Sequence, residues 1–440
     1  MKVIKKFFIG NTLKEKVLRS SSITILSYGL EQVLRLISNL VLTRLLFPEA
    51  FGIMSIASVI LIGLNMVSDI GIEQSIIQNK KGLQKKFRNT AWSAQIIRGV
   101  ILWGVACLLA YPLSIIYEEP ILFPLISALG FTLTIKGFTT TSLAVNNREL
   151  KIFRLSIVKV GTQLLGIILT VLFAFQYPSV WALAFGNIIG TLIGVLAGNM
   201  FLNDSHKHQF QIDKAILIEI VSFGKWIFLS SILGFLANQA DKMIFGKFMT
   251  MKDLGIYAVA VTLSQIPRSI LYSLNRMVLF PVYSLIREEN TISIQRKVKR
   301  AKFLVISLLL PLSIALIIFG DQLIKAMYDT RYHDAGWMVQ ILAAGVAFQI
   351  STNVGPFYLG FGRSGLFALT VSIKAFSLIL SMLIGGSLFG VTGLIVGVAV
   401  SSVLNYLAEI YFLIKFRLWF WKLDLVFISI ILLTIYSSLN

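Results

Sequence analysis

Basic side chains stand inside long apolar stretches of this sequence, where a charge is costly and usually faces a cavity or a partner. Seven of them lie well inside such stretches, and the acids at comparable depth are Glu31 and Asp69. An arginine can hold phosphate oxygens through two parallel hydrogen bonds, and a lysine acts as a point charge. The excess predicts a binding site for an anionic, phosphate-bearing group. The seven candidates are Arg35, Arg98, Lys136, Lys159, Lys225, Arg268 and Lys374.

Several of these charges belong to polar stripes with helical spacing. Gln265, Arg268, Tyr272 and Asn275 follow one another at intervals of three, four and three residues. A polar stripe on an otherwise apolar helix faces the bundle interior or water. We therefore add Gln265, Tyr272 and Asn275 to the candidate substrate-binding residues. Three further stripes share this rhythm: Ser156, Lys159, Gln163, Gly166 and Thr170; Thr370, Lys374, Ser377 and Ser381; and Ser27, Glu31, Arg35 and Ser38.

Structural roles compete with these functional ones. Lys159 and Lys374 are near the ends of their stretches and can extend to lipid headgroups. Arg35 is one turn after Glu31, so an intrahelical ion pair explains both residues equally well. Asp69 suits either a proton or cation site or a hydrogen bond at a helix end. Glu31 and Asp69 remain the candidates for ion coupling.

Composition predicts a membrane protein. The 440 residues are 56% hydrophobic and 14% charged, with a mean hydropathy of +0.82, whereas soluble domains have about a quarter charged residues. Apolar stretches of about 20 residues recur along the chain, as in polytopic helical proteins. The single Cys107 excludes an intrachain disulfide framework. In the linker, a metal site at His206 and His208 is less favoured than simple solvation, and no cofactor or catalytic residue is predicted.

Apolar periodicity predicts two groups of six spans, with loops too short for a soluble catalytic domain and without a P-loop motif. The spans are 20–46, 50–76, 89–116, 121–146, 152–176, 179–201, 215–240, 254–280, 302–319, 336–359, 366–386 and 391–414, and a candidate thirteenth is 423–438. The predicted domains are a cytoplasmic segment 1–20, an N-lobe 21–205, a cytoplasmic connector 206–214, a C-lobe 215–415 and a C-terminal segment 416–440. Pro267 should kink its helix.

Loop charges alternate along the chain. The first 20 residues and the loops 79–89, 146–154 and 287–302 are basic, whereas 111–120 and 176–180 lack Lys and Arg. Cytoplasmic loops are rich in basic residues, so every second loop and the N-terminus are predicted to be cytoplasmic. This topology also accounts for most of the formal net charge of +20, and no nucleic-acid partner is predicted. Lys242, Lys247 and Lys252 make 241–253 an outward exception.

One short connection occurs twice. "LTRLLFPEAFGIMSIA" at 42–57 and "IFGKFMTMKDLGIYAVA" at 244–260 share a basic residue, a Gly-Ile pair and an Ala at a constant offset of 203. An even number of helices per half gives both halves the same orientation, as in transporters with parallel repeats. The sequence therefore predicts an all-α polytopic membrane protein with two six-helix lobes related by a parallel pseudo-twofold axis.

The chain also resembles a known family over about residues 20–415. "LVLTRLLFPEAFGIMSIA" with "VSDIGIEQSIIQNK", "NNRELKIFRLSIVKVG", "VWALAFGNIIG", "FGKWIFLSSILGFLANQADKMIFGKFMTMKDLGIYAVAVTLSQIPRSI" and "LGFGRS" are similar, in this order, to polysaccharide exporters of the multidrug/oligosaccharidyl-lipid/polysaccharide (MOP) flippase superfamily. The branch most resembled is that of the colanic-acid and teichuronic-acid exporters. Many of its members have fourteen helices, so this chain departs from them at its C-terminal end.

The resemblance implies a flippase of the bacterial cell membrane. Its substrate would be a polyprenyl-(di)phosphate-linked oligosaccharide, moved from the cytoplasmic to the outer leaflet by alternating access through a cationic cavity between two lobes in a V shape. It also implies contacts with membrane lipids and other polysaccharide-assembly proteins, and in some members coupling to a proton or sodium gradient. The alternatives are an ion-coupled drug exporter of the same superfamily, for which the pocket should be more acidic, and a membrane polysaccharide polymerase or ligase, which should need a long outward loop.

Overall fold

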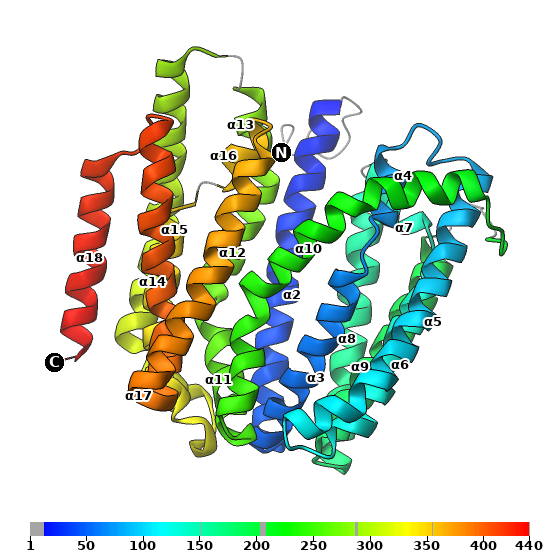
Figure 1. Ribbon diagram of the computed structural model, residues 1–440, viewed down its shortest axis with the longest axis horizontal. Helices are drawn as coiled ribbons and strands as arrows, with labels where there is room; N and C mark the ends of the chain where they lie inside the picture. Colours follow the sequence, from blue (N-terminus) through cyan, green and yellow to red (C-terminus); the bar gives the residue numbers. More distant parts are fainter. Residues whose placement is uncertain (1–12, 150, 203–207, 287–288, 354, 440) are drawn as a thin grey trace, which may run out of the picture. The chain divides into compact units, whose positions relative to one another are not determined.

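A computed structural model describes residues 13–149, 151–202, 208–286, 289–353 and 355–439 (Figure 1). Side chains are described in these ranges except at 13–21, 223–227, 229–230, 277, 281, 285, 291, 364 and 438–439. Throughout the described residues every regular element is a helix. The chain divides into two compact units, Met1–Ile232 (unit 1) and Leu233–Asn440 (unit 2). The finer domain limits proposed from the sequence stay predictions.

Unit 1 holds six spans, two of them broken into a long and a short helix. Its helices are α2 (Leu13–Leu45), α3 (Pro48–Val67), α4 (Ile72–Gln78), α5 (Lys85–Ile116), α6 (Leu122–Gly137), α7 (Ser142–Arg148), α8 (Ile152–Gln176) and α9 (Val180–Phe201). The breaks separate α3 from α4 and α6 from α7. Asp69 closes the first break, because its Oδ1 accepts a hydrogen bond of 2.9 Å from the N–H of Gly71, whose φ of 66° suits glycine.

Helix α10 (Lys214–Phe248) runs from unit 1 into unit 2. Unit 2 continues with α11 (Met251–Ser264), α12 (Ile266–Leu274), a π-helical turn (Asn275–Leu279), α13 (Phe280–Leu285), α14 (Thr291–Met327), a 3-10 turn (Thr330–Tyr332), α15 (Ala335–Ser351), α16 (Gly355–Gly360), α17 (Ser364–Lys415) and α18 (Trp421–Leu439). Lys242 and Lys247 lie on α10 rather than in the predicted loop 241–253. The α10 helix is held there by Asp241, whose Oδ2 accepts a buried hydrogen bond of 2.6 Å from Tyr257.

The predicted spans 50–76, 121–146, 254–280 and 336–359 were wrong as continuous helices, because each is interrupted. The bends are 60° between α6 and α7 and 46° between α11 and α12. Pro267, in the first turn of α12, cannot donate the hydrogen bond that would continue α11, so the kink predicted there is confirmed. Apolar periodicity does not register such breaks, since the apolar residues continue through them.

The packing scheme recurs in the two units. In unit 1 the third and fourth spans pack together (α5 with α6), as do the second and fourth (α3 with α6) and the fourth and sixth (α6 with α9). Unit 2 repeats these three pairings as α14 with α15, α11 with α15, and α15 with α17. The two copies of the repeated connection join α2 to α3 and α10 to α11, and Gly52 and Gly255 are both buried. The repeat seen in the sequence is therefore a structural repeat.

Helix α17 contains two of the predicted spans. Its backbone leaves the helical region at Phe389 and at Gly390, whose φ of 59° and ψ of −138° are accessible to glycine almost alone. The segments 364–388 and 391–415 then fold back on each other. A Cβ placed on Gly393 would collide with the carbonyl group of Gly385, and one on Gly397 would lie 2.5 Å from the carbonyl oxygen of Ser381. Small residues thus permit close backbone approach in this hairpin.

Length and composition support a membrane protein. In the described part of the chain, eight helices can cross a membrane, and two bent pairs raise this number to ten. The α17 helix counts once in this total although it covers two predicted spans. The α18 helix covers the candidate thirteenth span, and its 19 residues extend about 28 Å. Lys302 of α14 anchors it through a buried ion pair of 2.5 Å with Asp424.

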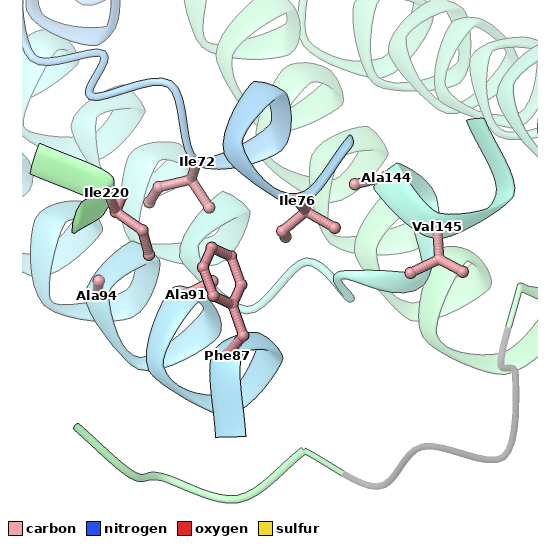
Figure 2. Close-up of a cluster of buried hydrophobic side chains, with 8 residues drawn as sticks. All are labelled: Ile72, Ile76, Phe87, Ala91, Ala94, Ala144, Val145 and Ile220. Atoms are coloured by element: carbon pink, nitrogen blue, oxygen red, sulfur yellow. The ribbon is translucent and has the colours of Figure 1, made fainter. Parts of the chain in front are cut away.

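Unit 1 contains a small apolar core formed by α4, α5, α7 and the start of α10 (Figure 2). Phe87 and Ile76 are fully buried in it, and Ile220 of α10 packs against them. This contact explains why the first part of α10 belongs to unit 1. The buried members are Ile72, Ile76, Phe87, Ala91, Ala94, Ala144, Val145 and Ile220.

The connector before α10 was expected to be solvated, and its described residues 209–212 are exposed, whereas His208 is half-buried against unit 1. His208 accepts a hydrogen bond of 3.2 Å from the backbone N–H of Thr141 and stacks obliquely on Trp92 at 5.2 Å. His206 lies outside the described residues. Alternate N–H groups of the connector donate to α5, from Gln209 to Asn89, from Gln211 to Ser93 and from Asp213 to Thr90. Polar residues on α5 thus supply the partners that an extended segment needs.

Asp213 completes this attachment. Its carboxylate lies 2.6 Å from Lys86 and caps α10 by accepting from the N–H groups of Ala215 and Ile216 at 2.9 and 3.0 Å. The hydrogen bond from Lys86, followed by that from Ile216, lowers the pKa of Asp213. Three segments predicted to be cytoplasmic therefore contact one another in unit 1: Lys86 of 79–89 pairs with Asp213 of the connector, and Arg148 of 146–154 donates to the carbonyl group of Asn79.

Candidate functional site

The break between α11 and α12 presents Arg268 with neutral partners. Its Nη2 donates to Asn238 Oδ1 of α10 at 2.7 Å and to the Tyr272 hydroxyl at 2.8 Å, and its Nη1 donates to Gln265 Oε1 at 3.2 Å. Within the described residues no carboxylate contacts this guanidinium. The break positions these groups, because Gln265 is the C-cap of α11 and Arg268 lies in the first turn of α12.

Lys374 adds a second cation to this cluster. It lies on α17, close enough to Arg268, Tyr272 and Glu409 to interact with each of them electrostatically. Arg268 and Lys374 are partly exposed and Tyr272 is 50% exposed, so a ligand can reach the cluster. The structure thus brings together Gln265, Arg268, Tyr272 and Lys374 from two separate predicted stripes. We call these four residues, with Asn238, the Arg268 cluster.

Asn275 has a different partner. Its amide and that of Asn353 exchange two hydrogen bonds, of 2.7 and 2.6 Å. Asn353 lies two residues after the end of α15, and Asn275 begins the π-helical turn after α12. The pair joins two helix breaks, where backbone groups lose their regular partners and polar side chains are needed.

Arg98 of α5 binds the end of α3. Its Nη2 donates to Asn65 O at 2.6 Å, to Asn65 Oδ1 at 2.9 Å and to Ser68 Oγ at 2.9 Å, and its Nε donates to Ser68 Oγ at 3.1 Å. Asp69 acts on Arg98 electrostatically. A cation at a helix C-terminus stabilises the last carbonyl groups. The geometry therefore gives Arg98 a helix-capping role that occupies its Nε and Nη2 donors.

The remaining candidates lie apart from these clusters. Glu31 of α2 is buried and forms an ion pair of 2.8 Å with the exposed Lys159 of α8. This pair replaces the predicted intrahelical pair of Glu31 with Arg35. Arg35 and Lys136 are both exposed, and the side chain of neither has a hydrogen-bonding or ion-pair partner among the residues that the structure describes. The side chain of Lys225 lies outside the described residues.

The sequence count of two deep acids was too low. Asp241, Glu409 and Asp424 are also buried, with 9%, 9% and 1% exposure. Asp241 fell in a predicted loop, and Asp424 lay at the start of the candidate thirteenth span, 423–438. Glu409 could have been found, because it follows Asn405 by four residues within an apolar stretch, the spacing of one helix face.

A family model described as "Polysaccharide biosynthesis protein" matches residues 41–337, which is more than half of the chain. This chain belongs to the polysaccharide biosynthesis protein family. The lipopolysaccharide biosynthesis protein WzxC of Escherichia coli (strain K12) is 20% identical over 407 residues, which cover 92% of this chain and 82% of that protein.

Solved structures show the same fold. The lipid II flippase MurJ in an inward closed conformation has a TM-score of 0.71 at 13% identity, over 96% of this chain and 98% of that one. An inward-facing multidrug resistance MATE family transporter of the MOP superfamily has a TM-score of 0.67 at 12% identity, over 88% of this chain and 95% of that one. This family member is accordingly a multi-pass membrane transporter of polysaccharide biosynthesis, and the alternative of a polymerase or ligase is set aside.

Proposed function

We propose that this family member moves a polyprenyl-(di)phosphate-linked oligosaccharide from the cytoplasmic to the outer leaflet of a bacterial cell membrane. The observation that carries the proposal is the Arg268 cluster, where two cations lie side by side and Arg268 has only neutral partners. Moving a phosphate group across hydrocarbon without such partners costs roughly tens of kcal/mol by the idealised Born solvation energy. Membrane lipids and other polysaccharide-assembly proteins are the proposed partners.

Arg268 is prepared to bind an anion. Its three neutral ligands fix the guanidinium plane without neutralising it, which lowers the ordering that binding requires. A phosphate can then accept in-plane hydrogen bonds from Arg268 while Lys374 supplies a second charge. Alternating access and the cationic cavity that it needs remain predictions of the same hypothesis.

Charge substitutions at Arg268 test this proposal in cells whose only copy is the variant. Arg268→Ala should lower surface polysaccharide and cause the lipid-linked intermediate to accumulate on the cytoplasmic side. Arg268→Glu should be more severe, since its carboxylate repels the phosphate. Arg268→Lys should retain more export than Arg268→Ala if charge dominates, and the same amount if the planar fork is required.

The matched control is Lys325→Ala, which removes a basic residue of unit 2 that is exposed and paired with Asp321 at 2.6 Å. It should export normally. If Arg268→Glu exports as well as Lys325→Ala at equal protein abundance, the Arg268 cluster does not bind the headgroup.

Orientation has its own test. In a Cys107→Ala background, single cysteines at positions 85 and 296 should be protected from an impermeant thiol reagent in intact cells, and those at 119 and 179 should react. Labelling of position 85 from outside would reverse the proposed direction of transport.

A further inference from the structure

A buried carboxyl group lies behind the Arg268 cluster, and the proposed binding step does not use it. Glu409, on the second half of α17, is 9% exposed, and its Oε1 accepts a hydrogen bond of 3.2 Å from Asn405. Its Oε2 is buried and has no hydrogen-bonding partner among the described residues. An ionised carboxylate in such a place needs a cation or a proton.

Several neighbouring elements contribute a polar or charged group near Glu409. The cations are Lys374 of the first half of α17 and Lys302 of α14, and the neutral groups are the hydroxyls of Thr352, after α15, and Tyr358 of α16. Lys302 is already committed to Asp424 of α18 at 2.5 Å. Lys374 is therefore the cation that remains to balance Glu409.

Lys374 can therefore balance either of two anions, the Glu409 carboxylate or a bound phosphate group. Without a ligand, its charge balances Glu409, and Lys302 balances Asp424. A phosphate-bearing group bound at Arg268 draws on the same ammonium group. A buried carboxylate that loses its cation is strongly destabilised, and taking up one proton removes its charge.

The hydrogen-bonding pattern around Glu409 fits such a proton. Besides atoms of the Lys302–Asp424 ion pair, three buried atoms there lack hydrogen-bonding partners among the described residues, namely Glu409 Oε2, Asn405 Oδ1 and the hydroxyl of Tyr358. Two of the three are pure acceptors while Glu409 is ionised. A proton on Oε2 converts one acceptor into a donor and lowers the number of unmatched acceptors.

We propose that Glu409 is a proton-binding site of this transporter, ionised while Lys374 balances it and protonated when an anionic headgroup engages Lys374. One proton enters for each headgroup bound and leaves when the headgroup is released. The coupling between the two events rests on the proposed function, whereas the proton site itself does not.

Infrared difference spectroscopy on pH steps tests the proton site without any ligand. The purified protein should show a band from a titrating protonated carboxyl group that is absent from Glu409→Gln and retained by the matched buried-acid control Asp241→Asn. In wild-type protein that carries isotopically labelled glutamate, this band should shift. The label identifies a glutamate even if Glu409→Gln folds poorly. A band that survives in Glu409→Gln, or that ignores the glutamate label, overturns the proposal.

Calorimetry with farnesyl diphosphate in two buffers of different ionisation enthalpy tests the coupling. Wild type should take up as much as one proton per diphosphate bound, and Glu409→Gln should bind without uptake. Binding to wild type without uptake overturns the coupling. Failure of wild type to bind contradicts the proposed function, and the infrared result then still decides whether Glu409 holds the proton.

Discussion

Arg98 and Arg268 were both candidate substrate-binding residues in the sequence. The structure separates them. Arg98→Ala should destabilise unit 1, because Arg98 holds the end of α3 through Asn65 and Ser68. Arg268→Ala should hardly change stability, because it also removes a charge that no described carboxylate balances.

The magnitude follows from the contacts. Arg98 makes four hydrogen bonds to two residues, and a hydrogen bond to a charged group contributes roughly 1.5–3 kcal/mol in soluble proteins. Side-chain hydrogen bonds in membranes contribute less, about 0.6 kcal/mol on average and up to 1.7. Because the four bonds go to only two residues, we count between two and four independent interactions. We therefore expect Arg98→Ala to lower the free energy of unfolding by about 2–4 kcal/mol.

For Arg268 the two contributions have opposite signs. Its hydrogen bonds to Asn238, Gln265 and Tyr272 stabilise the fold, whereas a half-buried cation without a counterion is itself unfavourable. We therefore expect a change of less than about 1 kcal/mol for Arg268→Ala, with loss of export. The two variants differ from wild type by the same chemical change, so each is the control of the other.

Reversible unfolding of the purified proteins in mixed micelles, with increasing SDS, measures both free energies. Surface polysaccharide measured in the same strains separates loss of function from loss of protein. Equal stability losses for the two variants, or a loss below about 1 kcal/mol for Arg98→Ala, would refute the assignment of Arg98 to helix capping.

Three further predictions concern packing, the connector and α18. Gly393→Ala should lower abundance and thermal stability sharply, because its Cβ would collide with the backbone of the facing half of α17; normal thermal stability would contradict the close approach. Asp213→Asn should increase amide hydrogen exchange in 209–213 at neutral pH, and wild type should show the same opening only as the pH falls below about 4. The pKa of the Asp213 carboxyl is lowered in the folded protein. The stability that this carboxylate contributes is therefore fully present above its unfolded pKa and is lost as the pH falls through its folded pKa. Asp424→Leu should cost about 3–5 kcal/mol by leaving Lys302 buried and unpaired, and adding Lys302→Met should restore most of that stability in the same SDS assay; no rescue would show that the ion pair is not what holds α18.

The sequence by itself determined the features that follow from the hydrophobicity of single segments and from repeated or periodic patterns along the chain. Apolar stretches and the two copies of one short connection predicted a membrane protein with a repeated six-span unit, because both signals are properties of single segments. The kink at Pro267 was also predictable, since the missing N–H acts within its own helix. The stripe that contains Arg268 identified a true cluster member, as helical spacing places Gln265 and Tyr272 on the same face.

Tertiary structure decided which of the buried charges have partners. Glu31 pairs with Lys159, more than a hundred residues away, and not with its helical neighbour Arg35. Arg98 is occupied by a helix end that only folding brings to it, whereas Lys374 joins Arg268 from a different span. The sequence shows whether a side chain is charged or apolar, but contacts between distant helices decide which group it pairs with. That partner determines whether a charge stabilises the fold or remains available to a ligand.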